Sequence, residues 1–280
     1  MNKNKALAEK FRTIEKIKAS DTIKVNGITL DVYDKQGKLK SVKELLVDGN
    51  EKIGKGIFHF STLPGFVEVY LEKFGYTEKG TCFCNCSGCY GQSGRFKQYP
   101  VNQVLLAYRT LVARYFIDFF ITEINREIKA HKIKYVRIHA TGDFFSREYA
   151  LAWYEIIKAN PQTIFWTYTK SFGYGFDDVL NAINALPNAN IVESVINNCG
   201  FNFGHIDYLL DTYYKLLAAG ENPYICRCGI DKNQHCSNCK ACSTHKYVLF
   251  IEHSTEYKAE KDPLYINIRD LINSQPSQEY

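Results

Sequence analysis

The stretch 135-YVRIHATGDFFSREYALAWYEIIKANPQTIFWTYTK-170 decides the fold. Its two ends, residues 135–140 and 163–170, are rich in β-branched and aromatic side chains, which favours strands. The segment between them, SREYALAWYEIIKAN, has the apolar period of an amphipathic helix. Two strands joined by one helix form a βαβ unit, whose strands run parallel. This stretch therefore predicts an α/β fold with a parallel sheet.

The same alternation continues toward the carboxyl end. DDVLNAINAL has a helical pattern, ANIVESVIN at 189–197 a strand pattern, and HIDYLLDTYYKLLAAG a helical pattern that stops at Gly220. Two more short strands are predicted in PYICRC and in KYVLFIEH at 246–253. A closed or partly open α/β barrel is the architecture that this order favours.

The amino-terminal part has a different character. Residues 1–56 are Lys-rich and weakly periodic, and IKVNGITLDVYD predicts a strand, an Asn-Gly turn and a second strand. One long helix is predicted from Val101 to about Lys132. We therefore expect a small appendage over 1–56, a barrel-like domain over 57–255 and a tail over 256–280.

Composition excludes several classes of protein. The 280 residues are 45% hydrophobic, which excludes a disordered chain. The first twenty residues are charged and lack the apolar region of a secretory signal, and the longest apolar stretch, near 115–124, is interrupted by Asp118. We therefore expect a cytoplasmic protein that does not enter the membrane. A net charge of +5 would help an encounter with nucleic acid without requiring one.

Nine of the ten cysteines fall in two groups. The first cysteine group is Cys82, Cys84, Cys86 and Cys89, and the second is Cys226, Cys228, Cys236, Cys239 and Cys242. A disulfide framework would spread its partners along the chain, and cysteines spaced two apart are too close to pair well. Thiols at this density are typical of iron–sulfur or zinc sites, which survive in the reducing cytoplasm.

The first group contains a C-x3-C-x2-C spacing, formed by Cys82, Cys86 and Cys89. This spacing resembles that of radical S-adenosylmethionine (SAM) enzymes, in which three thiolates hold a [4Fe–4S] cluster and the fourth iron binds SAM. Cys84 permits other groupings, so it is open which cysteines are ligands. The resemblance implies a radical-SAM-like partial (β/α) barrel with parallel strands.

The second group repeats as C-x2-C-x2-C at Cys236, Cys239 and Cys242. In ferredoxin-type sites a more distant thiolate completes such a set, and Cys226 or Cys228 would do so here. A structural zinc is the alternative, although the third close cysteine fits its usual pattern poorly. The sequence leaves open whether the protein carries one [4Fe–4S] cluster or two, and whether both groups share one site.

Polar residues follow the predicted strands at their carboxyl ends, where parallel α/β folds carry their sites. In radical SAM barrels a Gly-Gly-Glu-type turn at this place meets the methionine amino group, and Gly142 and Asp143 occupy the position here. Lys170 and Asn197 follow the next two strands and are predicted to hold cofactor or substrate. Asp143 has an alternative role as a helix cap, although Ser146 is the better candidate for that cap.

Two residues within the first strand, Arg137 and His139, alternate on one face. They either point into a barrel lumen toward a substrate or SAM, or are buried structural groups. The sequence does not separate these two interpretations.

Four strings resemble the phage and prophage "gene product 88" proteins: TC…CYG from Cys82 to Gly91, VRIHATGDFFSREYALAWYEI at 136–156, FWTYTKS at 165–171 and the last C-x2-C-x2-C. The resemblance spans roughly residues 55–250. It implies a mobile-element protein with cysteine-bound metal and names no substrate.

The sequence thus predicts an iron–sulfur protein of phage type, interpreted as a radical-SAM-like enzyme with an unknown substrate and an electron donor. The alternative is a non-catalytic protein stabilised by iron–sulfur or zinc, which acts on nucleic acid.

Overall fold

The computed structural model describes residues 22–25, 28–31, 44–49, 53–71, 76–84, 86, 89–92, 100–194, 206–227, 235–250, 270–271 and 273–274. Its central sheet has five strands in the order β3 (Val47–Asp48), β4 (Ile57–His59), β7 (Tyr135–Arg137), β8 (Ile164–Thr169) and β9 (Ala189–Glu193). Strand β3 is antiparallel to β4, and the other pairs are parallel. The predicted α/β class with a parallel sheet is confirmed.

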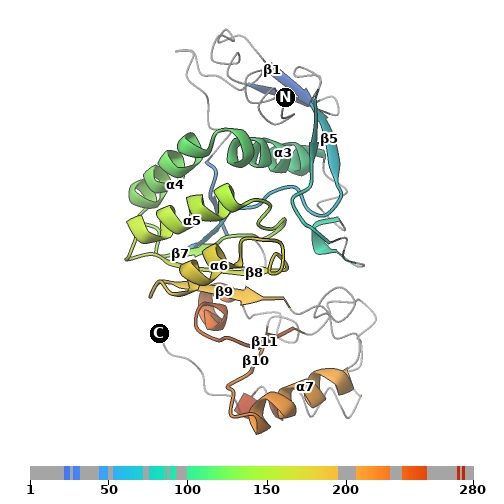
Figure 1. The fold of residues 1–280 in the computed structure, drawn as a ribbon, viewed down its shortest axis with the longest axis vertical. Coiled ribbons are helices and arrows are strands. Elements are labelled where there is room, and N and C mark those ends of the chain that lie inside the picture. The colour runs from blue at the N-terminus through green and yellow to red at the C-terminus, as the bar shows by residue number, and fades with distance from the viewer. Residues whose placement is uncertain are drawn as a thin grey trace.

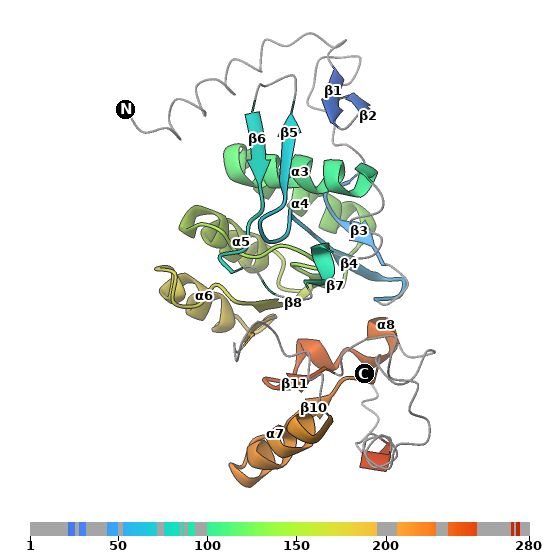
Figure 2. The same ribbon diagram turned by 90° about the vertical axis from the view of Figure 1, so that its right-hand side faces the viewer.

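Four helices pack against one face of this sheet. They are α3 (Pro100–Tyr115), α4 (Ile117–His131), α5 (Arg147–Ala159) and α6 (Asp177–Asn184). The core beneath them contains Val136 and Phe165 from the strands, Phe60 directly after β4 and Trp153 from α5. Figure 2 shows α3, α4 and α5 on one side of β7 and β8, and α8, β10 and β11 on the other.

The opposite face of the sheet is covered by the carboxyl-terminal part of the chain. Helix α7 (Ile206–Ala218) leads to β10 (Tyr224–Ile225), the short helix α8 (Cys236–Cys239), a 3-10 turn at Ala241–Ser243 and β11 (Val248–Leu249). Figure 1 shows α7 at the end of the molecule farthest from β1. Ile57 and Trp166 of the sheet pack against Cys236 and Cys242 of this layer.

A closed barrel is not formed by the described strands. The predicted strands at PYICRC and KYVLFIEH are present as β10 and β11, but they pair with each other rather than with β9. The radical-SAM-like partial barrel therefore stays a prediction, while the open, mostly parallel sheet is what the structure shows.

Helix α5 shows why the central βαβ pattern could be predicted from the sequence. Its N-cap is Ser146, whose hydroxyl accepts a hydrogen bond from Tyr149 N at 3.2 Å, as the sequence predicts. Six residues at helical spacing form its buried face: Tyr149, Ala150, Ala152, Trp153, Ile156 and Ile157. Burial of such a face, rather than intrinsic helix propensity, supplies most of the stability of a helix of this length.

The prediction of a single helix from Val101 to Lys132 is wrong in one respect. The segment forms two helices, and the break falls at Phe116, which has φ −128° and ψ 53°. Helix α4 then ends at Lys132 in the left-handed conformation, with φ 51°. After the break, Phe120 and Ile124 of α4 are fully buried in the core.

The predicted appendage is also shorter than expected. Strands β1 (Thr22–Val25) and β2 (Ile28–Asp31) form the antiparallel hairpin that the Asn-Gly pair predicts. Residues 44–49, however, belong to the main body, because β3 joins the central sheet and Leu45 and Leu46 lie in its core. Their backbone N–H groups donate to the Glu127 carboxylate, both at 2.7 Å.

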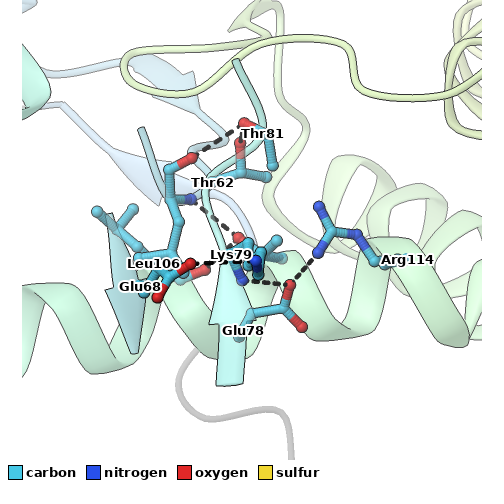
Figure 3. Close-up of polar contacts among 9 residues, drawn as sticks. Thr62, Glu68, Glu78, Lys79, Thr81, Leu106 and Arg114 are labelled. Atoms are coloured by element: carbon cyan, nitrogen blue, oxygen red, sulfur yellow. Dashed lines mark hydrogen bonds and ion pairs between the residues drawn. The ribbon is translucent and has the colours of Figure 1, made fainter. Parts of the chain in front are cut away.

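A second hairpin leads into the first cysteine group. Strands β5 (Glu68–Leu71) and β6 (Tyr76–Lys79) are antiparallel, and Figure 3 shows Glu78 of β6 pointing at Arg114 of α3. The two side chains form an ion pair, and the Glu78 side chain is wholly buried. Its Oε2 atom has no hydrogen-bond partner among the described residues. Burial raises the pKa of this carboxyl from 4.5 to about 7, against the pull of Arg114.

This carboxyl should make stability fall as pH rises. Between pH 4.5 and about 7 the unfolded chain releases the proton that the folded chain retains, so ionisation costs the fold up to about 3 kcal/mol. We expect the free energy of unfolding in urea to depend less on pH in Glu78→Gln than in the parent. Equal slopes for both proteins between pH 5 and 8 would contradict this prediction.

Candidate functional site

The first cysteine group lies at the carboxyl edge of the sheet. Cys82 follows directly after Thr81, whose backbone N–H donates to Leu63 O at 2.9 Å and whose hydroxyl contacts the Thr62 hydroxyl at 2.9 Å. The loop that follows β4 therefore holds the start of the cysteine loop. Burial, and secondly the nearby Asp143 carboxylate, raise the pKa of the Cys82 thiol to about 12.

Within this group two sulfurs are in contact. Cys84 Sγ and Cys86 Sγ are 3.6 Å apart, and Lys170 Nζ donates to Cys86 Sγ at 2.9 Å. Burial, and secondly the hydrogen bond with Cys86, raise the pKa of Cys84 to about 11. A lysine that directly follows β8 thus reaches the cysteine loop.

An aromatic contact holds the same loop from the β8–α6 connection. The Phe83 and Tyr174 rings are stacked with centroids 4.2 Å apart and an angle of 9° between their planes. Both rings are partly exposed. Sequence reasoning missed this pair, because residues about ninety positions apart gave no sign of being neighbours.

The Asp143 carboxylate accepts its hydrogen bonds from other groups of the protein. It accepts hydrogen bonds from the Thr169 hydroxyl, from Lys170 N at 2.8 Å and from Phe144 N at 2.8 Å. Its own backbone N–H donates to the Thr81 hydroxyl at 3.0 Å. These bonds favour a structural role, in which Asp143 joins the loops after β6, β7 and β8, over the predicted contact with SAM.

Gly142 is required for close packing. Its φ is +81°, and a Cβ atom on it would lie 1.9 Å from Thr62 Oγ1. A glycine here therefore has a reason independent of any ligand.

The second cysteine group lies over the face of the sheet. Cys226, Cys239 and Cys242 pack with Tyr224 and Tyr168, and the Tyr224 hydroxyl is 3.1 Å from Cys239 Sγ. Burial, and secondly the charge of Cys236, raise the pKa of Cys242 to about 12, which Arg137 partly opposes. These four cysteines therefore lie close to one another around two tyrosines.

Hydrogen bonds from two parts of the chain hold the backbone of the segment that carries this group. Ser237 N donates to Ile53 O at 2.9 Å. The Asn190 side-chain amide of β9 donates to Cys242 O at 2.9 Å and to His245 O at 3.1 Å. Both ends of the central sheet thus contribute to positioning the second cysteine group.

The structure separates Arg137 from His139. A bend after β7 turns His139 toward the helices, where its Nε2 lies 2.9 Å from the Tyr149 hydroxyl, and burial lowers its pKa to about 3. Arg137 faces the other way, with its guanidinium carbon 6.0 Å from the centre of the Tyr168 ring. The prediction that both share one face is wrong, and His139 is a buried structural residue.

Each cysteine group therefore has a cation from the sheet beside it. Lys170 contacts Cys86, and Arg137 lies over the ring of Tyr168, which packs with Cys242. The buried Nε atom of Arg137 has no hydrogen-bond partner in the described part of the chain. Negative charge among the cysteines would be attracted to both of these cations.

Both groups also meet the same strand. Tyr168 packs on the second group and Lys170, two residues later, contacts the first. Two residues of extended chain span about 7 Å. The two cysteine groups therefore contact residues that lie about 7 Å apart along one segment of the chain.

The described cysteines are eight in number and form no disulfide with one another. No three Cys, His, Asp or Glu side chains within the described ranges already surround a common point as metal ligands. The predicted ligands Cys82, Cys86, Cys89, Cys226, Cys236, Cys239 and Cys242 would have to reorient around a metal. Asn197 and Cys228 lie outside the described residues.

The helices described are all too short or too polar to cross a membrane.

A mostly parallel α/β fold with thiol groups at its edge and on its face defines a cysteine-rich α/β protein. The family model for "Gene product 88" matches residues 44–260, and this chain belongs to that family. The "Gene 88 protein" of Mycobacterium phage L5 is 30% identical over 148 residues, which cover 47% of this chain and 59% of that protein. The chain thus spans less than two thirds of that relative. No solved structure matches.

Proposed function

We propose that this protein binds iron–sulfur clusters through its two cysteine groups and that the first cluster, held by Cys82, Cys86 and Cys89, reacts with SAM. The observation that carries the proposal is the position of a cation near each group: Lys170 contacts Cys86, and Arg137 lies over the Tyr168 ring beside Cys242. Iron–sulfur clusters ligated by thiolates carry net negative charge, which these cations would balance. Zinc bound by thiolates is the alternative metal.

The donor chemistry fits the group. Every side chain proposed as a ligand is a thiol, the ligand type that iron–sulfur clusters use. The raised pKa values of Cys82 and Cys242 mean that metal binding must displace protons. A cluster with three protein ligands supplies an open iron at which SAM can be reduced and cleaved.

The protein's own residues then have defined tasks. Lys170 donates to a ligand sulfur and balances its charge, while Asp143 holds the backbone of Lys170 in place. Hydrogen bonds to ligand sulfurs tune the reduction potential of a cluster. The substrate is proposed to approach at the carboxyl edge of the sheet, where the partly exposed Phe83 and Tyr174 rings lie.

Anaerobic purification followed by iron, sulfide and zinc analysis tests the metal. We expect brown protein with iron and sulfide in equal amounts, and replacement of Cys236, Cys239 and Cys242 by Ala should remove about half of the iron if the sites are separate. Total loss of iron would instead indicate one shared site. Stoichiometric zinc with negligible iron would refute the iron–sulfur proposal.

The reaction with SAM is tested on the same preparation. Adding SAM to the reduced protein should change the electron paramagnetic resonance spectrum and, with time, yield 5′-deoxyadenosine. A loaded cluster whose spectrum ignores SAM would leave a non-catalytic iron–sulfur protein, which binds nucleic acid or another partner, as the better account.

A further inference from the structure

Cys84 is the cysteine that the C-x3-C-x2-C ligand set does not use. Its sulfur nevertheless lies 3.6 Å from Cys86 Sγ, and both residues are partly exposed. The spacing in the sequence indicates that cysteines two apart pair poorly, but here the fold brings the two sulfurs into contact. Rotation of the side chains would close the remaining gap to the S–S bond length of about 2.05 Å.

Two contacts hold this geometry. Lys170 Nζ donates to Cys86 Sγ at 2.9 Å. The ring of Phe83, the residue before Cys84, is stacked on Tyr174 at 4.2 Å. The β8–α6 connection therefore fixes both the sulfur of one cysteine and the backbone beside the other.

We propose that, in the metal-free protein, Cys84 and Cys86 form a redox-active dithiol that exchanges with small-molecule disulfides. The Cys86 thiol gives its proton to water, and its sulfur attacks one sulfur of the small disulfide. The S–S bond of that disulfide breaks, a new S–S bond forms to Cys86, and the other half leaves as a thiolate. Cys84 then gives its proton to water and attacks the Cys86 sulfur, which releases the second half. The two protein thiols lose two electrons and two protons, and the small disulfide is reduced to two thiols.

The neighbours assign the two roles. Cys86 is the attacking residue because Lys170 Nζ donates to its sulfur at 2.9 Å and holds that sulfur in place beside Cys84. Cys84 contacts that sulfur and is positioned to displace the bound half-disulfide. Excess small-molecule thiol would reverse the same two exchange steps and restore the dithiol.

This inference rests on the proposed function in one respect only. If Cys86 is a cluster ligand, the Cys84–Cys86 disulfide removes it from the ligand set and blocks cluster assembly. The dithiol would then make metal loading depend on the thiol–disulfide balance of the cell. The exchange reaction itself needs no metal.

Oxidised glutathione tests the exchange on full-length, metal-free protein. We expect two glutathione thiols released per chain and a disulfide that peptide mass spectrometry places between Cys84 and Cys86. The Cys84→Ser variant should release only one thiol and keep glutathione attached to Cys86. The Cys86→Ser variant should form no Cys84–Cys86 bond and should react more slowly with oxidised glutathione. A disulfide elsewhere, or no reaction of this pair, would overturn the proposal.

The role of Lys170 is tested by rate. Lys170→Met should slow the first exchange step about tenfold, whereas Lys158→Met, at an exposed lysine over the Tyr154 ring, should not change it. Equal rates for both variants would refute the assigned role of Lys170. Iron analysis of the parent protein is a separate assay. A protein that binds no iron but forms the Cys84–Cys86 disulfide refutes the proposed function alone. A protein that binds iron but does not form this disulfide refutes the dithiol alone.

Discussion

Replacing Gly142 with Ala should destabilise the metal-free protein by about 3–5 kcal/mol. The backbone at this position has φ +81°, and the new Cβ would overlap Thr62 Oγ1 at 1.9 Å and approach Thr81 Oγ1 at 2.8 Å. The added methyl group therefore meets strain and a steric clash together. Denaturation by urea, followed by circular dichroism, measures the loss.

Gly173→Ala is the matched control for this change. Its φ is +84°, yet a Cβ atom there would meet nothing within 4 Å. Only the cost of the left-handed backbone remains, about 1–2 kcal/mol. In the double variant with Thr62→Ala, part of the loss caused by Gly142→Ala should be recovered. Equal losses for both glycines would show that the contact with Thr62 is not decisive.

Replacing Asp143 with Asn should cost the metal-free fold about 2–4 kcal/mol. The carboxylate accepts from the Thr169 hydroxyl and from two backbone N–H groups, and the amide NH₂ of Asn would face donors where an oxygen now accepts. Asp143 is buried, so water cannot replace the lost bonds. Thermal and urea unfolding of parent and variant would measure the difference.

Asp178→Asn is the control for this second change. Asp178 accepts two hydrogen bonds from Arg147, at 2.7 and 2.6 Å, but the pair is exposed to solvent. Exposed ion pairs contribute less than about 1 kcal/mol. If Asp143→Asn were as mild as this control while abolishing the response of the cluster to SAM, Asp143 would be a cofactor ligand after all.

The parallel sheet could be predicted because each strand and helix between residues 135 and 193 has its own local period. The Ser146 cap was equally readable, since a hydroxyl before a helix has one common use. The break at Phe116 was not, because no glycine or proline marks it in the sequence.

The types of residue in the site could be predicted from the sequence, but their arrangement in space could not. The spacing of cysteines indicates ligand loops, but it does not say that Trp166 and Tyr168 of the sheet would lie beneath the second group. Asp143 shows the same limit. A carboxylate at a strand end suits a cofactor and suits internal donors equally well, and only the surrounding hydroxyl and N–H groups distinguish them.

The order of elements along the chain also matters for its synthesis. The apolar face that carries Ile57 and Trp166 exists once β8 has left the ribosome, but its cover, residues 235–250, is made later. At a synthesis rate of about 5–20 residues per second, this surface remains exposed to water for several seconds in each nascent chain. Nascent chains are therefore expected to be prone to association through this face until residues 235–250 have been made.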